Sequence, residues 1–224
     1  YGCSGLESIV LPEKLTAIAN QTFYDCSNLT SITIPEGVAT IGTQAFYNCK
    51  GELIINSKAI AETDYSKRSN SPTNSETGWL AGAKFTKLSF GNNVASIGNY
   101  TFWGMSSLEN IVILEGIKRI GLEVFYGCSN LKSVTLGKGL TSIANTLFWR
   151  CTSLTDIIIP NGIKSIGARA FDSCSSLSSI TIPNSVTFIG SQAFCDSGLN
   201  SIEIPDSVLN VGAGAFYRCR SLRS

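Results

Sequence analysis

The sequence predicts a solenoid, a β-rich α/β repeat fold in which short coils stack into one continuous body. Three observations support this fold class. A pattern of 23 residues recurs along the chain, Phe recurs at one position of it, and Pro recurs at another. Because a unit of this length cannot bury its own apolar face, neighbouring units must stack to make a core.

Each unit follows the pattern L-x-x-I-x-I-P-x-x-V-x-x-I-G-x-x-A-F-x-x-C-x-x. The segment 52–84 is longer but also counts as a coil, with Trp79 at the Phe position and Gly82 at the Cys position, which makes nine coils in one domain, 1–224. Its polar stretch from Ser66 to Gly78 predicts a surface loop. Both ends fall within a repeat, so we expect a longer array. The regular units begin at Leu6, Leu29, Phe85, Leu108, Leu131, Leu154, Leu177 and Leu199.

The first half of each unit predicts a strand and then a second extended segment. In the second unit, Ile32 and Ile34 are two residues apart and therefore share one face of a strand. Pro35 ends that strand because it has no backbone N–H to donate. Val38 and Ile41 then point inward from a second short extended or turn segment.

The second half of each unit predicts a close approach of coils and a short helical turn. Position fourteen is Gly in most units but Ala19 and Ala144 in two, so small size matters more than a positive φ. The spacing from Ala45 to Cys49 suits one helical turn that faces the core. The Phe of position eighteen then forms an internal column: Phe23, Phe46, Phe102, Phe125, Phe148, Phe171, Phe194 and Phe216.

Composition excludes several functions. The chain has 224 residues, a formal net charge of +1 and no His, so it lacks the field that attracts nucleic acid and the commonest general base and metal ligand. No apolar run is long enough to span a membrane. The chain opens on Tyr1-Gly2-Cys3-Ser4 without a basic and then apolar segment, so we expect any signal and anchor to lie outside it.

The strand pattern, the turn and the A-F-x-x-C segment resemble the leucine-rich repeat, specifically its BspA-like branch of bacterial cell-surface proteins. The resemblance covers nearly the whole chain and implies a solenoid with a parallel sheet on its concave face. It also implies a cell-surface or secreted protein and, for some members, adhesion to host matrix proteins. Leu114 and Gly137 depart from the Pro position, and Met105 and Ser197 depart from the Cys position.

Seven of the eight cysteines share position twenty-one, where they could form disulfides, hold a metal or fill an apolar slot. Without His and without any Cys-x-x-Cys, a zinc site is disfavoured. Met105 replaces one of these cysteines, which favours free, buried thiols acting as small apolar side chains. Cys195 stands at position nineteen instead, so we predict it to be the accessible thiol.

The variable positions carry the candidate binding surfaces. The outer strand positions three and five are small and mostly neutral, which suits either a protein-binding face or a solvated one. The loop Ser66–Gly78 is a further candidate, since recognition residues often lie on loops. Position nineteen predicts an aromatic stripe, which offers rigid area for a protein or a sugar ring or merely shields the turn beneath. Its aromatic residues are Tyr24, Tyr47, Trp103, Tyr126, Trp149 and Tyr217.

These features predict a non-enzymatic binding module that adheres to host or matrix proteins, with glycans as further candidate ligands. We expect no catalytic residues, no metal, no cofactor, no nucleic acid and no membrane insertion. An activated Ser or Thr nucleophile needs a base within reach, and the carboxylates are scattered. The alternative is a structural spacer with no ligand of its own. Open array ends also offer a route to self-association.

Overall fold

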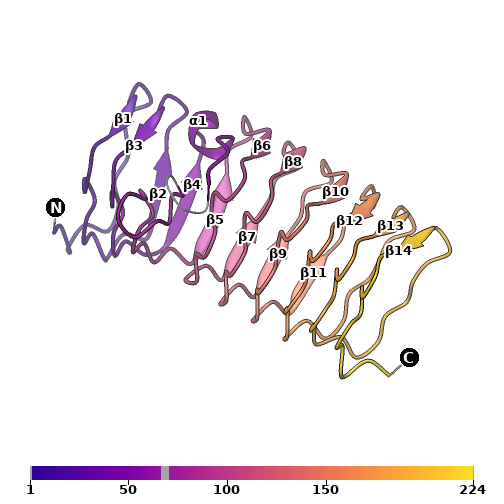
Figure 1. Cartoon of the computed structure of the whole chain (residues 1–224). Helices are drawn as coiled ribbons and strands as arrows, with labels where there is room; N and C mark the ends of the chain where they lie inside the picture. The colour runs from indigo at the N-terminus through magenta and orange to yellow at the C-terminus, as the bar shows by residue number, and fades with distance from the viewer. Residues whose placement is uncertain (1, 67–70, 224) are drawn as a thin grey trace.

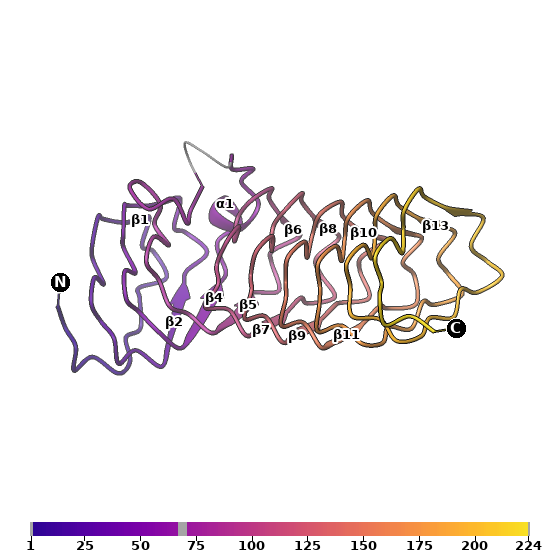
Figure 2. The same ribbon diagram turned by 60° about the horizontal axis from the view of Figure 1, so that its bottom comes forward.

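The computed structural model, which describes residues 2–66 and 71–223, is a β-solenoid. Figure 1 shows the coils standing in one row, with the N- and C-termini at opposite ends. The same row viewed after rotation shows each coil as an open loop of similar outline (Figure 2). The coils follow one another in chain order.

The first extended segment of six coils forms a strand of one parallel sheet. Its six strands pair in the order β11-β9-β7-β5-β4-β2. In β2, Ile32 and Ile34 are buried while Ser31 and Thr33 are half-exposed, and Pro35 follows directly, as predicted. The strands are β2 (Ser31–Ile34), β4 (Glu52–Ile55), β5 (Lys87–Phe90), β7 (Asn110–Val112), β9 (Ser133–Thr135) and β11 (Asp156–Ile158).

The second extended segment of each regular coil forms a two-residue strand, and these strands also pair in parallel. They fall into three short sheets, β1-β3, β6-β8 and β10-β12-β13-β14. Their partners lie 22 or 23 residues apart, as in the pairing of Ile143 with Ile166. The strands are β1 (Ala17–Ile18), β3 (Thr40–Ile41), β6 (Ser96–Ile97), β8 (Arg119–Ile120), β10 (Ser142–Ile143), β12 (Ser165–Ile166), β13 (Phe188–Ile189) and β14 (Asn210–Val211).

The predicted helical turns are wrong, and so is the α/β description. Within the described residues the one α-helix is α1 (Lys58–Ala61), which belongs to the long coil 52–84. Elsewhere the A-F-x-x-C segment and the residue before it form a run of turns with two residues at positive φ, such as Gln21 at 54° and Asp25 at 58°. Ala45, Phe46 and Cys49 are nonetheless fully buried, so the predicted inward direction is confirmed.

The turn run differs from a helix because its backbone bonds to the next coil. The N–H of Phe23 donates to the carbonyl of Ala45 at 2.8 Å, and the N–H of Asp25 donates to that of Tyr47 at 2.9 Å. A helix would direct these donors along its own axis. A left-handed residue costs about 1–2 kcal/mol, and the bonds that run from coil to coil offset this cost.

Position fourteen is small because backbones meet there. A Cβ on Gly42 would lie 2.3 Å from the backbone nitrogen of Asn20, and one on Gly167 would lie 2.6 Å from that of Asn145. Neither glycine has a positive φ. The prediction that this position requires small size is therefore confirmed.

The Phe column is confirmed over most of the array. From Phe102 to Phe216, neighbouring rings are stacked, with centroids 5.3–5.9 Å apart, and Phe23 stacks on Phe46 at 5.5 Å. The long coil breaks the column. Trp79 is buried there but meets Phe46 edge-on, at 6.0 Å and 76°.

The long coil also shifts the predicted register by one residue. In ordinary coils the Cys N–H bonds to the Phe carbonyl, as from Cys26 to Phe23, and in the long coil Ala83 bonds to Leu80 in the same way. This turn bond therefore lies one residue after the positions that we assigned to Trp79 and Gly82, while the bond from the N–H of Asn48 to the carbonyl of Gly82 places Gly82 opposite Tyr47. The insertion is only partly the polar surface loop we predicted, because Ser71 and Pro72 are buried; residues 67–70 lie outside the described residues.

Candidate binding surface

The aromatic residues of position nineteen lie on the turn side of the coils, and the structure groups five of the six into two stacks. Tyr24 and Tyr47 form the first, with centroids 4.5 Å apart and rings 7° from parallel. Gly82 follows Tyr47 in the row, and a Cβ there would lie 2.3 Å from the Tyr47 ring. The missing side chain of Gly82 therefore leaves room for Tyr47 in the long coil.

Trp103, Tyr126 and Trp149 form the second stack, which we call the aromatic cluster. Trp103 lies parallel to Tyr126 at 5.4 Å, and Trp149 meets Tyr126 edge-on at 5.0 Å. All three side chains are half-buried. Each ring thus shields the turns below while part of its surface stays in contact with solvent.

Two arginines border the aromatic cluster. The Arg169 guanidinium lies 5.2 Å from the Trp149 ring centre, and that of Arg150 lies 5.7 Å from Trp149 and 6.0 Å from Tyr126. Cation–π contacts of this kind contribute about 0.5–1 kcal/mol at exposed sites. Aromatic and Arg side chains together are the residue types that most often dominate protein interfaces.

The aromatic row does not continue into the C-terminal coils. Asp172 and Cys195 take position nineteen in the next two coils, and both are buried. Tyr217 stands beyond them with 60% of its surface exposed, so it does not join the cluster. The six aromatic residues that the sequence predicted as one stripe are therefore two stacks and one isolated ring.

Asp172, Cys195 and Asp196 place three ligand-type atoms within 4.8 Å of one another. Both carboxylates already have protein partners, because Asp172 accepts a hydrogen bond from Ser173 Oγ at 2.7 Å and Asp196 pairs with Arg218 at 3.1 Å. Burial is the main cause that raises the pKa of Asp172, while Arg169 lowers it. The group is best described as a hydrogen-bonded ionic network between neighbouring coils.

The prediction that Cys195 is the accessible thiol is wrong. Cys195 is 5% exposed, and burial, followed by the charges of Asp172 and Asp196, raises its pKa to about 11. The thiol of Cys195 lies 3.7 Å from Asp196 Oδ2. Cys3 is the exposed cysteine, and Cys219 is half-exposed.

The cysteines of position twenty-one are free, and all except Cys3 and Cys219 are buried, as predicted. From the second coil onward, each thiol of position twenty-one also donates to the Phe carbonyl of the preceding coil, as Cys151 Sγ does to Phe125 at 3.1 Å. Burial raises the pKa of Cys128 to about 12. The recurring Cys therefore combines an apolar volume with a weak donor that a Met cannot supply.

The outer face of the six-stranded sheet is less polar than the sequence suggested. Ile158 is 81% exposed and Val112 is 42% exposed, both at outward position five. We grouped this column with small neutral residues and so missed these two exposed apolar side chains. An Ile at an outward strand position was the signal available in the sequence.

The insertion of the long coil borders a hollow of about 360 Å³ beside α1. Ile41, Ile60, Tyr65, Pro72 and Trp79 contribute to its wall. The hypothesis that the loop Ser66–Gly78 binds a ligand stays a prediction, since residues 67–70 lie outside the described part of the chain.

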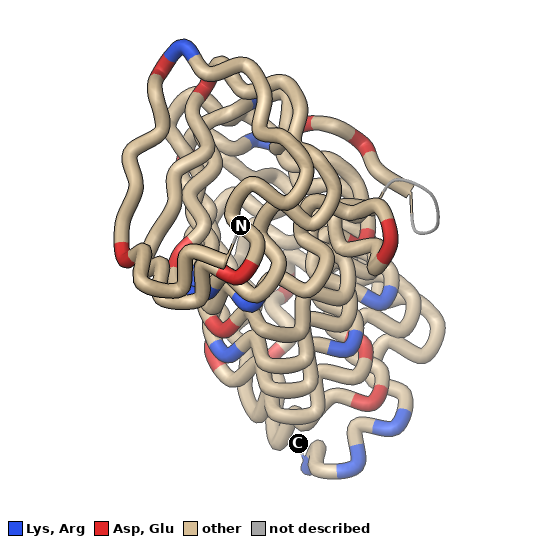
Figure 3. The backbone as a smooth tube through the Cα atoms, turned by 90° about the vertical axis from the view of Figure 1, so that its left-hand side faces the viewer, with Lys and Arg blue, Asp and Glu red and all other residues tan. Residues whose placement is uncertain are grey.

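Charged side chains alternate along the coils. Figure 3 shows basic and acidic residues interspersed from one end of the array to the other. Three of the described ion pairs join neighbouring coils, as between Lys132 and Glu109 at 3.0 Å. Across residues 2–66 and 71–223, no helix has the length and apolar character needed to cross a bilayer.

Comparison with known proteins finds a matching repeat family and similar solved structures. The family model for the BspA type leucine rich repeat region matches six copies over residues 1–77 and 95–223. The chain is similar to the T. pallidum leucine-rich repeat protein, with 33% identity, a TM-score of 0.60 and coverage of 63% of this chain and 69% of that one. A search of curated proteins found no match.

Two further solved structures extend the likeness over more of the chain. A leucine-rich cell surface protein of Faecalibacterium prausnitzii A2-165 is 26% identical, with a TM-score of 0.63 over 77% of this chain and 46% of its own. A leucine-rich repeat protein of Bacteroides ovatus is also 26% identical, with a TM-score of 0.57 over 99% of this chain and 73% of its own. The chain thus spans less than half of the Faecalibacterium protein.

Proposed function

Because the chain belongs to the BspA-type leucine-rich repeat family, we propose that it is a non-enzymatic binding module of a bacterial cell-surface protein. The module holds a host or matrix protein on its solenoid surface, with glycans as a second ligand class. The name of the Faecalibacterium relative, a leucine-rich cell surface protein, supports this location.

The aromatic cluster is the observation that carries this proposal. Trp103, Tyr126 and Trp149 present half-buried rings in fixed contact, bordered by Arg150 and Arg169. Rings held in place by their neighbours lose little conformational entropy on binding. A preorganised surface of this kind supports recognition of a protein partner or stacking against a sugar ring.

The spacer alternative has its own support. The rings of position nineteen follow the repeat and pack on one another, which also serves to cover the turns. A spacer would keep these contacts and have no ligand. The two functions therefore predict different outcomes when the aromatic cluster is removed. A binding module would lose retention on its partner, and a spacer would show no change.

We test the proposal with the Trp103→Ala, Trp149→Ala double variant in the chain 1–224. Retention is measured on immobilised extracellular-matrix proteins and mucin-type glycans by surface plasmon resonance. Since hot-spot aromatics each contribute 2 kcal/mol or more, we expect affinity to fall at least about 30-fold, with an unchanged circular dichroism spectrum.

Phe188→Ala is the matched control, because Phe188 is a 44% exposed aromatic residue on β13, outside the aromatic cluster. It should leave retention unchanged. Equal retention by the wild-type chain and the double variant, or no retention on any surface, would favour the spacer.

A further inference from the structure

A groove follows the ends of the strands on the sheet side of the last four coils. Three adjoining hollows of about 490, 350 and 410 Å³ compose it, and neighbouring hollows share wall residues. Asn161, Thr181 and Pro183 join the first to the second, and Asn184, Glu203 and Pro205 join the second to the third. We call this feature the strand-end groove.

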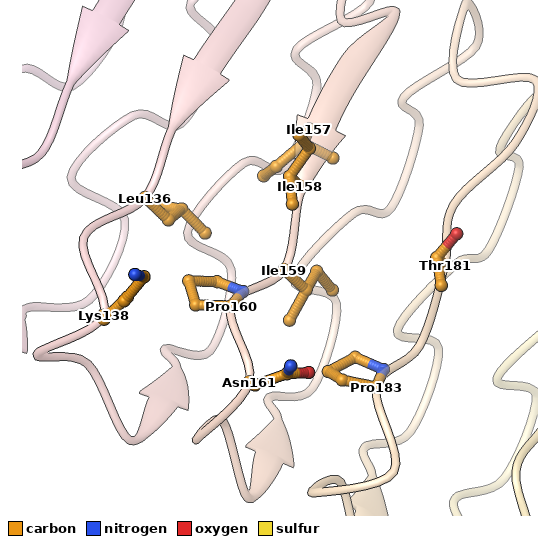
Figure 4. Close-up of a pocket in the computed structure, with 9 residues that line it drawn as sticks. All are labelled: Leu136, Lys138, Ile157, Ile158, Ile159, Pro160, Asn161, Thr181 and Pro183. Carbon is orange, nitrogen blue, oxygen red and sulfur yellow. The ribbon is translucent and has the colours of Figure 1, made fainter.

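The apolar end of the strand-end groove lies where the sheet opens. Figure 4 shows Leu136, Ile158, Ile159 and Pro160 around this hollow, with Thr181 across from them. Within the described residues, no backbone hydrogen bond joins β11 to residues 179–181 of the next coil. The opening exposes apolar surface that the closed part of the sheet would cover.

Core exposure gives an independent measure of this opening. Ile157 and the equivalent residue of the next coil, Ile180, are each 8% exposed, whereas Ile32 and Leu53 in the closed part of the sheet are 1% and 0% exposed. The groove therefore reaches past Ile158 to inward-facing isoleucines. An apolar side chain of a ligand would find walls on several sides here.

Two amide side chains follow the apolar end. Asn161 and Asn184 occupy the same position of successive coils, both are exposed, and neither is hydrogen-bonded within the described structure. An Asn amide offers donors and an acceptor, the complement of a peptide unit. Their repeat along the array, at roughly the 4.8 Å spacing of strands, suits a ligand whose own backbone amides recur.

The far end of the strand-end groove is acidic. Glu203 and Asp206 are exposed and line the third hollow. Neither carboxylate has an ion-pair partner within the part of the chain that the structure describes, in contrast to Glu109 and Glu115, which pair with lysines. A basic side chain in this position would gain two unpaired carboxylates.

We propose that the strand-end groove binds an extended peptide that carries an apolar and a basic residue three positions apart. Ile158 and Glu203 lie two coils apart, or roughly 10 Å at 4.8 Å for each coil. A polyproline II chain advances about 9.3 Å in three residues and returns to the same face. The apolar residue would then lie over Ile158, the basic residue beside Glu203 and the peptide backbone along Asn161 and Asn184.

This inference rests on the proposed function and names a second surface for it, on the sheet side and away from the aromatic cluster. A small apolar molecule would fill only the first hollow and would not depend on Glu203. A second copy of this chain would give an oligomer whose formation depends on Ile158. The experiment below distinguishes both of these alternative ligands from a peptide.

The probe is fluorescein-labelled Ser-Leu-Pro-Pro-Arg-Ser, together with the reversed order Ser-Arg-Pro-Pro-Leu-Ser, and binding is measured by fluorescence anisotropy. Replacing Leu by Ser or Arg by Glu in the better probe should weaken binding about tenfold or more. In the protein, Ile158→Ser and Glu203→Arg should do the same. Ile158 and Glu203 are exposed, so both variants should unfold at the wild-type urea concentration.

Two control variants make comparable substitutions outside the groove. Val112→Ser lies at the same outward position two coils earlier, and Glu36→Arg lies in the second coil; neither should change peptide binding. Glu203→Arg should restore binding of the peptide that carries Glu in place of Arg, which a general loss of folding could not do.

The proposal is overturned if neither Ile158→Ser nor Glu203→Arg weakens peptide binding. It is also overturned if neither of the two probes binds the wild-type chain. Dependence on Ile158 alone would assign the groove to a small apolar ligand, and an oligomer that Ile158→Ser dissociates would assign it to a second copy. Loss of matrix retention in the Trp103, Trp149 variant with intact peptide binding separates this inference from the proposed function.

Discussion

Replacing Phe148 by Ala tests the central packing claim, because Phe148 lies in the longest part of the Phe column. Its ring is fully buried and stacks on Phe125 at 5.8 Å and on Phe171 at 5.5 Å. A buried Phe→Ala substitution costs about 3–5 kcal/mol. The loss should be near the upper end because a rigid coil on each side limits collapse of the cavity.

Equilibrium unfolding in urea, followed by circular dichroism, measures this cost. With a slope of about 2 kcal/mol per molar urea, a loss of about 4 kcal/mol lowers the midpoint by about 2 M. Because repeat arrays can lose cooperativity, amide hydrogen exchange should accompany the measurement. Exchange should quicken first in the coils around Phe148 and spread outward from them.

Phe188→Ala makes the same chemical change at a 44% exposed ring outside the column. It should cost less than about 1 kcal/mol, as surface substitutions usually do. If the two variants lost equal stability, or if Phe148→Ala lost less than about 1 kcal/mol, stacking of the Phe column would not be the source of the core.

Two further predictions concern the reactivity of the cysteines and the titration of Asp172. In the native chain at pH 8, a thiol reagent such as DTNB should react rapidly with Cys3. The Cys3→Ser variant should lose this rapid phase, and the Cys195→Ser variant should keep it. Loss of the rapid phase in the Cys195→Ser variant would contradict the burial of Cys195. Burial raises the pKa of Asp172, so the folded state binds its proton more tightly than the unfolded state, and this contribution to stability is present below pH 4 and is lost as the pH rises through the folded pKa. Asp172→Asn should therefore gain stability relative to the wild type between pH 4 and pH 7, as measured by urea unfolding at both values; a relative loss over that range would show that Arg169 and Ser173 outweigh burial.

The period, the strand positions and the inward residues could be predicted from the sequence, since each depends on which side chains are apolar and how they are spaced. Ile32 and Ile34 are two apart, Pro35 ends the strand, and Phe46 and Cys49 point inward. Every coil repeats this spacing of apolar residues, so a coil with an ambiguous pattern can be aligned with its neighbours. The small size of position fourteen was equally predictable, because two coils carry Ala there.

The turn conformation could not be predicted in the same way. The spacing of Ala45, Phe46 and Cys49 fits both a helical turn and a run of turns that direct the same side chains inward. The choice depends on hydrogen bonds to a segment about 22 residues away, such as the bond from Phe23 to Ala45. Spacing within one coil carries no information about that bond.

The candidate surfaces were only partly predictable for a similar reason. The aromatic residues of position nineteen are partly exposed, as predicted, but Asp172 and Cys195 are buried and divide the row. The strand-end groove was missed. Exposure at Ile158 and burial at Cys195 depend on how neighbouring coils splay or close.

The amino-acid sequence by itself determined the repeat, the side of each coil that faces the core and the family, because apolar spacing is written within every unit. Only the tertiary structure decided the turn conformation, the break in the Phe column at Trp79 and the surfaces available to a partner. These features arise from contacts between coils, where a bond or a ring in one unit depends on the backbone of the next.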